Sequence, residues 1–134
     1  MNKRFVAISV VLPAVLVACA PQPEKVGRTL YQEYCTSCHG TSGRGDGPLA
    51  ADLDRPVPDL TLIEQRNGGN FPTTRIMSVI DGYTRVRDGN ITMPEFGIEL
   101  QAGPLILYDS GDGKPSPTPS KLLALAEYIE SIQR

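Results

Sequence analysis

The feature that most constrains this chain is a cluster of sulfur and nitrogen ligands, Cys35-Thr36-Ser37-Cys38-His39. The 134 residues contain three cysteines and one histidine, and two of those cysteines and the histidine lie within these five positions. The chain also has 13 glycines, 12 prolines and only 6% aromatic residues. A loop-rich chain with so thin a core gains stability from a large bound apolar group. We therefore expect this cluster to determine both the chemistry and much of the folding.

The spacing C-x-x-C-H is the signature of covalent attachment of c-type haem. Two thiols three residues apart can each add to a vinyl group on one edge of the porphyrin, and the adjacent His39 then lies under the iron as its ligand. Three alternatives compete with this interpretation. A thioredoxin-like motif needs a βαβ setting that the sequence lacks, a zinc site needs four ligands, and a structural disulfide leaves His39 unexplained. We expect one covalent haem c held by Cys35, Cys38 and His39.

Residues 1–18 have the pattern of a signal peptide, with a basic start and an apolar run. The run is shorter than the ~20 residues needed to span a bilayer. Its end, Leu16–Cys19 (LVAC), resembles a bacterial lipobox, in which the cysteine is lipidated and becomes the first mature residue. Ala18-Cys19-Ala20 also fits an A-x-A site for ordinary signal cleavage. Both interpretations predict export to the periplasmic side of a bacterial membrane, and the first predicts a lipid anchor at Cys19.

The remaining chain reads as a short tether, residues 19–24, followed by one domain over residues 25–134. Removal of Lys3 and Arg4 with the signal leaves 11 basic and 15 acidic residues. This balance provides no basic patch for phosphates, so nucleic acid is excluded as a partner, and neutral or basic protein surfaces are favoured. We expect a monomer that meets redox proteins, as electron donor and acceptor, at membrane complexes.

Hydrophobic periodicity predicts a mostly helical domain with long loops rich in glycine and proline. The expected helices cover residues 24–38, 61–67, 74–81 and 119–133. Thr61 and Glu64 stand in capping-box register at the start of the second. Residues 83–117 lack helical periodicity; PLILY within them suggests one strand, but Pro115, Pro117 and Pro119 leave little room for a sheet. Asp109 to Gly113 offers too few ligands for a calcium loop.

Beyond the haem motif, the chain is similar to class I bacterial cytochromes c over about residues 25–100 and 119–133. In that family a glycine and an aromatic residue on the first helix pack against a leucine and an aromatic residue on the last. The matching residues are Gly27, Tyr31, Leu125 and Tyr128. The resemblance implies a small helical fold wrapped round a single haem.

The resemblance also implies how the proximal histidine is oriented. The family has a G-P-x-L element after the haem motif, and Gly47-Pro48-Leu49 corresponds to it, although Leu49 directly follows Pro48. By this correspondence the Pro48 carbonyl accepts the Nδ1 proton of His39, which fixes the ring and raises its basicity.

Met93 lies in TMPEFG, which matches the family's M-P-x-F-G loop. The match implies that Met93 is the second axial ligand of the iron, and a thioether ligand raises the reduction potential. The alternatives are Met77 or an open position. Met77 lies in the apolar stripe of a predicted helix, where core packing is expected.

A haem with both axial positions filled passes one electron at a time and leaves no position for a substrate. We therefore expect a one-electron carrier of the periplasm or outer membrane face. Nothing in the sequence suggests a catalytic base or nucleophile, so we expect no enzyme activity. Two other functions stay open: a cytochrome subunit of a membrane-associated dehydrogenase or oxidase, and a haem-based sensor with a weak or missing sixth ligand. Arg75, Arg85 and Arg87 are candidate partners of the haem propionates, although solvated surface positions explain each one as well.

Overall fold

The structure, a computed structural model, describes residues 22–84 and 93–134. The predicted signal peptide, Cys19, Arg85 and Arg87 lie outside the described residues. Across the two described ranges, no helix combines the length and the apolar character needed to cross a bilayer.

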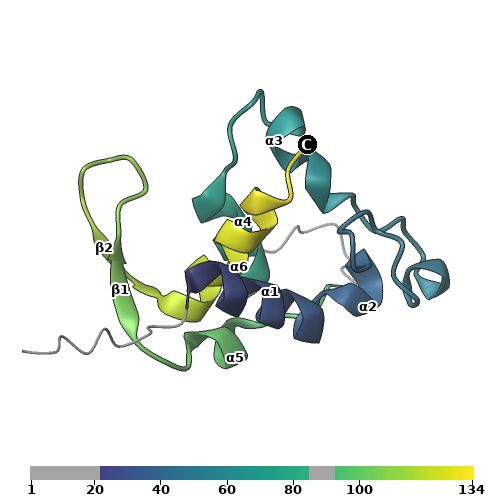
Figure 1. The fold of residues 1–134 in the computed structure, drawn as a ribbon, viewed down its shortest axis with the longest axis horizontal. Helices are drawn as coiled ribbons and strands as arrows, with labels where there is room; N and C mark the ends of the chain where they lie inside the picture. The colour runs from purple at the N-terminus through teal and green to yellow at the C-terminus, as the bar shows by residue number, and fades with distance from the viewer. Residues whose placement is uncertain (1–21, 85–92) are drawn as a thin grey trace, which may run out of the picture.

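The described residues form a mostly helical domain, as the sequence predicts. Its elements are α1 (Pro23–Tyr34), α2 (Thr36–His39), η1 (Ala50–Asp52), η2 (Leu60–Leu62), α3 (Ile63–Arg66), α4 (Thr73–Asp81), α5 (Gly97–Gln101), β1 (Leu105–Tyr108), β2 (Ser116–Pro119) and α6 (Ser120–Ser131). In Figure 1, α1, α4 and α6 gather at the centre, the β1–β2 hairpin stands at one side, and α2 lies toward the opposite side. The core therefore consists of helices, and the sheet lies at its edge.

Close packing of α1 on α6 fixes this core. Gly27 lies against the backbone of Ala124, and a Cβ at position 27 would overlap the Ala124 carbonyl and crowd Tyr128. Tyr31 is 1% exposed and packs on Tyr128 with ring centroids 5.2 Å apart. Leu125 is fully buried in the same cluster. The helix pairing that the family resemblance implies is therefore present, because only glycine at position 27 lets the two helices approach so closely.

The first helix is shorter than the sequence predicts. α1 ends at Tyr34, and the chain turns at Cys35 before α2 begins. The Cys35 N–H donates to the Tyr31 carbonyl at 2.9 Å, and the His39 N–H donates to the Cys35 carbonyl at 2.9 Å. The Tyr31 hydroxyl donates to the Gly40 carbonyl at 2.8 Å, which draws the chain after α2 back onto α1. The segment that local periodicity predicts as one helix is therefore two helices, joined at Cys35.

The predicted capping box of Thr61 and Glu64 is wrong. Asp59 caps η2 instead, because its Oδ1 accepts the Thr61 N–H at 2.8 Å and the Thr61 hydroxyl at 2.6 Å. The Glu64 N–H donates to Oε1 of Gln133 at 2.9 Å. Gln133 lies just beyond α6, so the partner of this helix start is distant in the sequence.

The segment after Met93 contains more regular structure than predicted. The five-residue helix α5 is too short to show periodicity, and β1 pairs with β2 in an antiparallel hairpin. Because N–H groups alternate in direction along a strand, Pro117 and Pro119 both lack donors on one edge. The other edge, with Ser116 and Thr118, is left to pair with β1. The strand at PLILY is thus confirmed, and the prediction that the prolines leave little room for a sheet is wrong.

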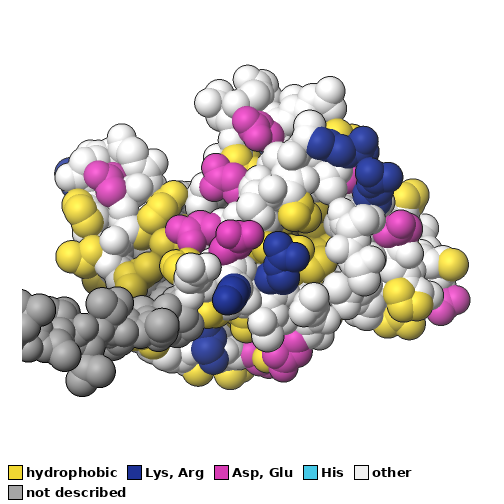
Figure 2. Space-filling model, in the orientation of Figure 1, with side chains coloured by type: hydrophobic (Ala, Val, Ile, Leu, Met, Phe, Trp, Pro, Cys, Tyr) yellow, Lys and Arg dark blue, Asp and Glu magenta, His cyan; other side chains and the backbone are white. Residues whose placement is uncertain are grey.

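The hairpin exposes apolar side chains. Leu105 and Leu107 are 61% and 74% exposed, and Figure 2 shows hydrophobic side chains on both sides of the hairpin. Its turn is stabilised internally, since Oδ1 of Asp109 accepts the N–H groups of Gly111 at 2.9 Å and Gly113 at 3.0 Å.

Throughout residues 22–84 and 93–134, no group of three or more His, Cys, Asp or Glu residues could hold a metal ion.

Candidate functional site

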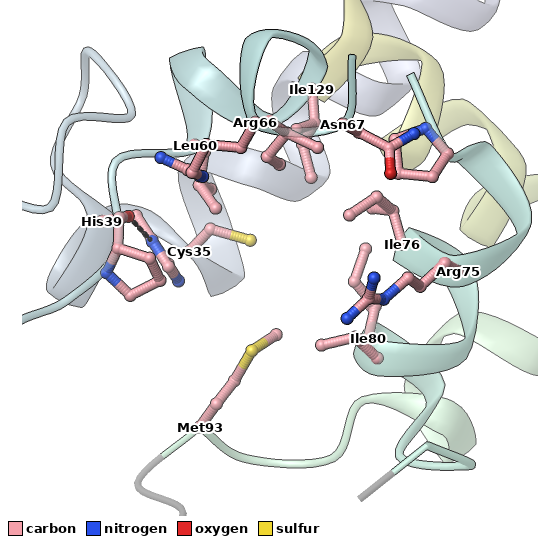
Figure 3. Close-up of a pocket in the computed structure, with 14 residues that line it drawn as sticks. Cys35, His39, Leu60, Arg66, Asn67, Arg75, Ile76, Ile80, Met93 and Ile129 are labelled. Carbon is pink, nitrogen blue, oxygen red and sulfur yellow. Dashed lines mark hydrogen bonds between the residues drawn. The ribbon is translucent and has the colours of Figure 1, made fainter. Parts of the chain in front are cut away.

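A cavity of about 360 Å³ opens beside the Cys35–His39 segment. Its walls come from the α1–α2 turn, η2, α3, α4, α6 and the chain at Met93 (Figure 3). The lining residues are Cys35, His39, Pro58, Leu60, Ile63, Arg66, Asn67, Pro72, Arg75, Ile76, Val79, Ile80, Met93 and Ile129. Most of these side chains are apolar, so the cavity suits a large apolar group with few polar contacts.

His39 is held in a defined orientation at one end of this cavity. Its side chain is buried, and Nδ1 lies 3.3 Å from the carbonyl oxygen of Pro58. Burial lowers the pKa of His39, against a smaller opposing effect of the bond to Pro58. The imidazole is therefore neutral at neutral pH. A neutral ring that donates from Nδ1 keeps the lone pair of Nε2, which is the atom that binds a metal.

The predicted partner of His39 was Pro48, and this prediction is wrong: the acceptor is Pro58. The G-P-x-L correspondence already had a flaw, because Leu49 directly follows Pro48. The sequence contains a better match ten residues later, where Pro58 and Leu60 are separated by one residue. The Leu60 N–H donates to the Gly43 carbonyl at 2.7 Å, which brings this later segment across to the loop after His39.

The two motif cysteines differ in their surroundings. Cys35 is 7% exposed and its sulfur points into the cavity, whereas Cys38 is only partly buried and lies outside the lining (Figure 3). Burial, with a smaller contribution from Cys38, raises the pKa of the Cys35 thiol to about 12. Redox-active C-x-x-C motifs depend on a lowered thiol pKa. The raised value therefore argues against the thioredoxin-like alternative.

The two methionines of the domain have different positions. Met77 is 7% exposed and belongs to the hydrophobic core, as its helical stripe predicts. Met93 lines the cavity, and its thioether enters from the side opposite α3 (Figure 3). The structure thus brings Cys35, His39 and Met93 together around one space and leaves Met77 outside its lining.

Two arginines line this largely apolar cavity. Arg75 was a predicted candidate for the propionates, and it reaches the cavity from α4. Arg66 was not predicted; it reaches the cavity from α3, and its Nη2 donates to the Asp59 carbonyl at 2.6 Å. No local motif marks Arg66, because its place depends on how α3 packs.

The residues present fit a haem. The cavity volume lies in the range of about 300–1,000 Å³ found for cofactor sites. The imidazole of His39 and the thioether of Met93 are the two axial ligand types of cytochromes c, and the Cys35 thiol lines the same cavity. The guanidinium groups of Arg66 and Arg75 can neutralise the haem propionates.

A family model described as "Cytochrome C oxidase, cbb3-type, subunit III" matches residues 22–103. This match covers more than half of the chain and includes the C-x-x-C-H segment and Met93. The chain belongs to this family. No curated protein matches it. As a class I c-type cytochrome, the chain has a domain that binds haem c covalently and transfers electrons through it. The family and the cofactor that the C-x-x-C-H motif predicts are thus confirmed, and one haem fits a domain of this size.

Proposed function

We propose that this c-type cytochrome is a one-electron carrier whose haem iron is bound by His39 and Met93, without enzyme activity. The observation that supports it most directly is the arrangement of the two side chains. Both line the same cavity, next to the buried thiol of Cys35 (Figure 3). A centre with both axial positions filled can pass an electron but offers no position for a substrate.

Each residue has a distinct role in this proposal. Haem c, when bound, supplies an iron that alternates between the ferric and ferrous states. Cys35 and Cys38 would hold the haem through thioether bonds. His39 would bind the iron through Nε2 while the Pro58 carbonyl fixes its ring. Met93 would bind the iron through its sulfur, and a thioether ligand favours the ferrous state.

We place the carrier on the periplasmic side of a bacterial membrane, with a lipid anchor at Cys19. The support is the LVAC sequence that ends at Cys19 and the export that is typical of cytochrome c domains. Its electron donor and acceptor are then redox proteins in the same membrane.

A second candidate is a permanent cytochrome subunit of a membrane-associated oxidase. The family description names a subunit of an oxidase, and the exposed Leu105 and Leu107 of the hairpin are of the kind that a stable interface covers. Purification in mild detergent separates the two candidates, because a subunit co-purifies in fixed ratio with other chains and a carrier does not.

The attachment chemistry is tested on denatured protein. Wild type should retain haem after denaturation and give a c-type pyridine haemochrome spectrum, because two thioether bonds survive unfolding. Cys35→Ala should leave at most one thioether and shift that spectrum. Cys19→Ser is the matched control, since it removes the third cysteine and should leave attachment unchanged. Haem that extracts from wild type into acidified organic solvent would contradict the proposal.

A further inference from the structure

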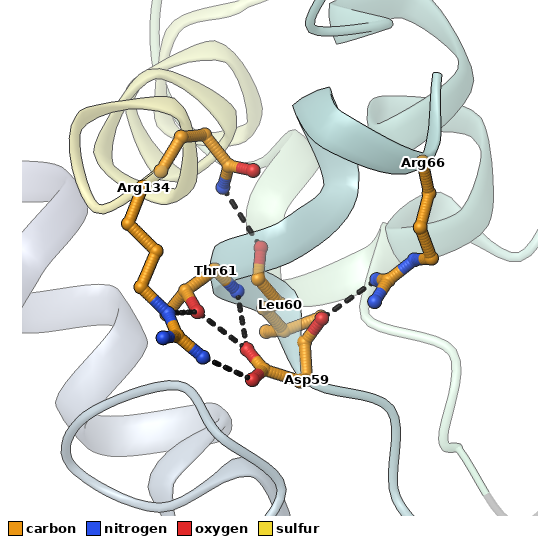
Figure 4. Close-up of polar contacts among 6 residues, drawn as sticks. Asp59, Leu60, Thr61, Arg66 and Arg134 are labelled. Carbon is orange, nitrogen blue, oxygen red and sulfur yellow. Dashed lines mark hydrogen bonds and ion pairs between the residues drawn. The ribbon is translucent and has the colours of Figure 1, made fainter. Parts of the chain in front are cut away.

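The Pro58 carbonyl that faces His39 belongs to a segment held by distant residues. Next to it, the Asp59 carboxylate accepts the Thr61 N–H at 2.8 Å and the Thr61 hydroxyl at 2.6 Å on Oδ1. Its Oδ2 accepts Nη2 of Arg134 at 3.1 Å (Figure 4). Arg134 is 75 positions from Asp59 in the sequence, so this contact ties the haem side of the domain to the chain beyond α6.

Thr61 closes the arrangement into a ring of three side chains. Its hydroxyl donates to Asp59 and accepts Nε of Arg134 at 2.8 Å, and its carbonyl accepts the Arg134 N–H at 3.1 Å. Thr61 is 4% exposed. The Thr61 hydroxyl and, to a smaller extent, Arg134 lower the pKa of the Asp59 carboxyl. The carboxylate therefore stays ionised at neutral pH and keeps its charge-assisted bond to Arg134.

The backbone on either side is fixed as well. The Asp59 carbonyl accepts Nη2 of Arg66 at 2.6 Å, and the Leu60 carbonyl accepts Nε2 of Gln133 at 2.8 Å. On the other side, Gly45 packs against the Val57 carbonyl so closely that a Cβ at position 45 would overlap it. Residues 57–61 are thus held from the loop after α2, from α3 and from the chain beyond α6.

We propose that Asp59, Thr61 and Arg134 act as a positioning clamp, which sets the Pro58 carbonyl against Nδ1 of His39 and so tunes the reduction potential. This inference rests on the proposed ligation of iron by His39. The Nδ1 to oxygen distance of 3.3 Å lies just beyond the usual range of about 2.7–3.2 Å for an N–H···O hydrogen bond. A small shift of the carbonyl therefore changes the strength of the bond considerably.

The direction of the effect follows from ligand basicity. An imidazole that shares its Nδ1 proton is a more basic ligand, and a more basic ligand favours the ferric over the ferrous state. Loosening the clamp weakens the bond to Pro58 and should raise the reduction potential. The Coulomb effect of losing the Arg134 cation has the opposite sign, because less positive charge near the iron favours the ferric state. Arg134→Ala therefore separates positioning from charge.

The experiment compares holoprotein variants in a spectroelectrochemical titration at constant pH, with the thermal midpoint recorded on the same samples. The variants are Arg134→Ala, Arg134→Lys and Asp59→Asn. Asp59→Ala is added if this variant can be expressed as holoprotein. The matched control is Arg28→Ala. Arg28 also pairs with a carboxylate, Glu24 at 3.5 Å, and lies 5.4 Å from the Tyr128 ring centroid, but it has no bond to residues 57–61.

We expect Arg134→Ala to raise the reduction potential by at most about 59 mV. For one electron, this shift corresponds to a tenfold change in the ratio of ferric to ferrous haem. Arg134→Lys should restore part of the difference, and Arg28→Ala should match wild type. The Nδ1 proton of His39 should exchange with solvent faster in Arg134→Ala, as followed by NMR of the reduced protein. Asp59→Asn should also raise the potential, because it removes the charge that holds Arg134.

Two results would overturn the clamp. One is a reduction potential that stays constant or falls in Arg134→Ala while the thermal midpoint drops. This result would mean that the ring stabilises the fold and does not raise or lower the potential through His39. The other is an equal rise in Arg28→Ala, which would make the effect unspecific. Wild-type protein without a histidine-ligated c-type spectrum would instead contradict the proposed function, and the clamp would lose its premise.

Discussion

At the scale of single residues, surroundings rather than side-chain type decide what a ligand atom does. Met77 and Met93 carry the same thioether, yet one is buried in the core and the other lines the cavity beside His39. Cys35 and Cys38 also have different surroundings, one facing the cavity and the other lying outside its lining, although both are proposed to hold the haem. Met77 therefore serves as a control within the chain for the proposed role of Met93.

Substitution of Met93 should change what binds the iron and leave the haem attached. In Met93→Ala the thioether bonds remain, but the sixth position opens, so the reduced protein should bind carbon monoxide readily and the potential should fall. Reduced wild type should bind it poorly. The sulfur-to-iron charge-transfer band at the red end of the oxidised spectrum should disappear in the variant. Met77→Leu, which conserves volume in the core, should keep the band and cost less than about 1.5 kcal/mol of stability.

Fast stoichiometric uptake of carbon monoxide by reduced wild type would contradict the carrier and favour the sensor. Loss of the charge-transfer band in Met77→Leu with retention in Met93→Ala would reassign the ligand.

Local motifs predict the proposed ligands, which the structure places at one cavity, but not the residues around them. C-x-x-C-H and M-P-x-F-G each lie within a few positions, so Cys35, His39 and Met93 can be proposed as haem-binding residues from the sequence. The acceptor Pro58 depends on which proline the loop after α2 brings to the ring, whereas the resemblance of Gly47-Pro48-Leu49 to the family's G-P-x-L element favours Pro48. The contact of Asp59 with Arg134 spans the domain and leaves no local pattern.

At the scale of elements, the pairing of α1 with α6 carries the core, and one glycine permits it. The helices were predicted because their apolar residues recur at helical spacing, whereas α5 and the second strand were missed because each is too short for periodicity. The turn at Cys35 was missed for a different reason. The bond from Tyr31 to Gly40 that accompanies it is tertiary and has no signature in the helix itself.

Adding one methyl group at position 27 should destabilise the domain. An exposed helical glycine gains about 1 kcal/mol on replacement by alanine, but Gly27→Ala places its Cβ on the Ala124 carbonyl. Overpacking typically costs about 1–3 kcal/mol, so we expect a net loss of stability in chemical denaturation of the holoprotein. Gln32→Ala, on the exposed face of α1, should change stability by less than about 0.5 kcal/mol. Stability of Gly27→Ala equal to wild type would show that α1 and α6 pack less closely than described.

At the scale of the whole molecule, the functional unit extends beyond the part that matches the family. The match ends at residue 103, yet α6 supplies Ile129 to the cavity wall, and Gln133 and Arg134 hold the segment that orients His39. The hairpin also lies beyond the match and carries the exposed Leu105 and Leu107. The residues after 103 thus complete the site on one side and provide an apolar surface on another.

The proposed anchor decides where this unit works. A single acyl chain binds membranes only marginally, but two chains anchor a protein stably. Diacylated wild type should therefore partition into detergent with its haem absorbance, and its mature chain should begin at a modified Cys19. Cys19→Ser should release the protein or stall its processing. The released form should keep the wild-type potential, because Cys35, His39 and Met93 are untouched.

Ala20→Ser is the matched control, since it changes the adjacent residue and leaves the thiol in place; it should partition as wild type does. A mature wild-type chain that begins at Pro21 and is fully soluble would establish ordinary signal cleavage instead. The carrier would then diffuse through the periplasm, and its encounters with redox partners would depend on its excess of acidic over basic residues. In that case its electron-transfer rate to a membrane partner should fall with rising ionic strength, whereas an anchored carrier should respond less because the lipid keeps it at the surface.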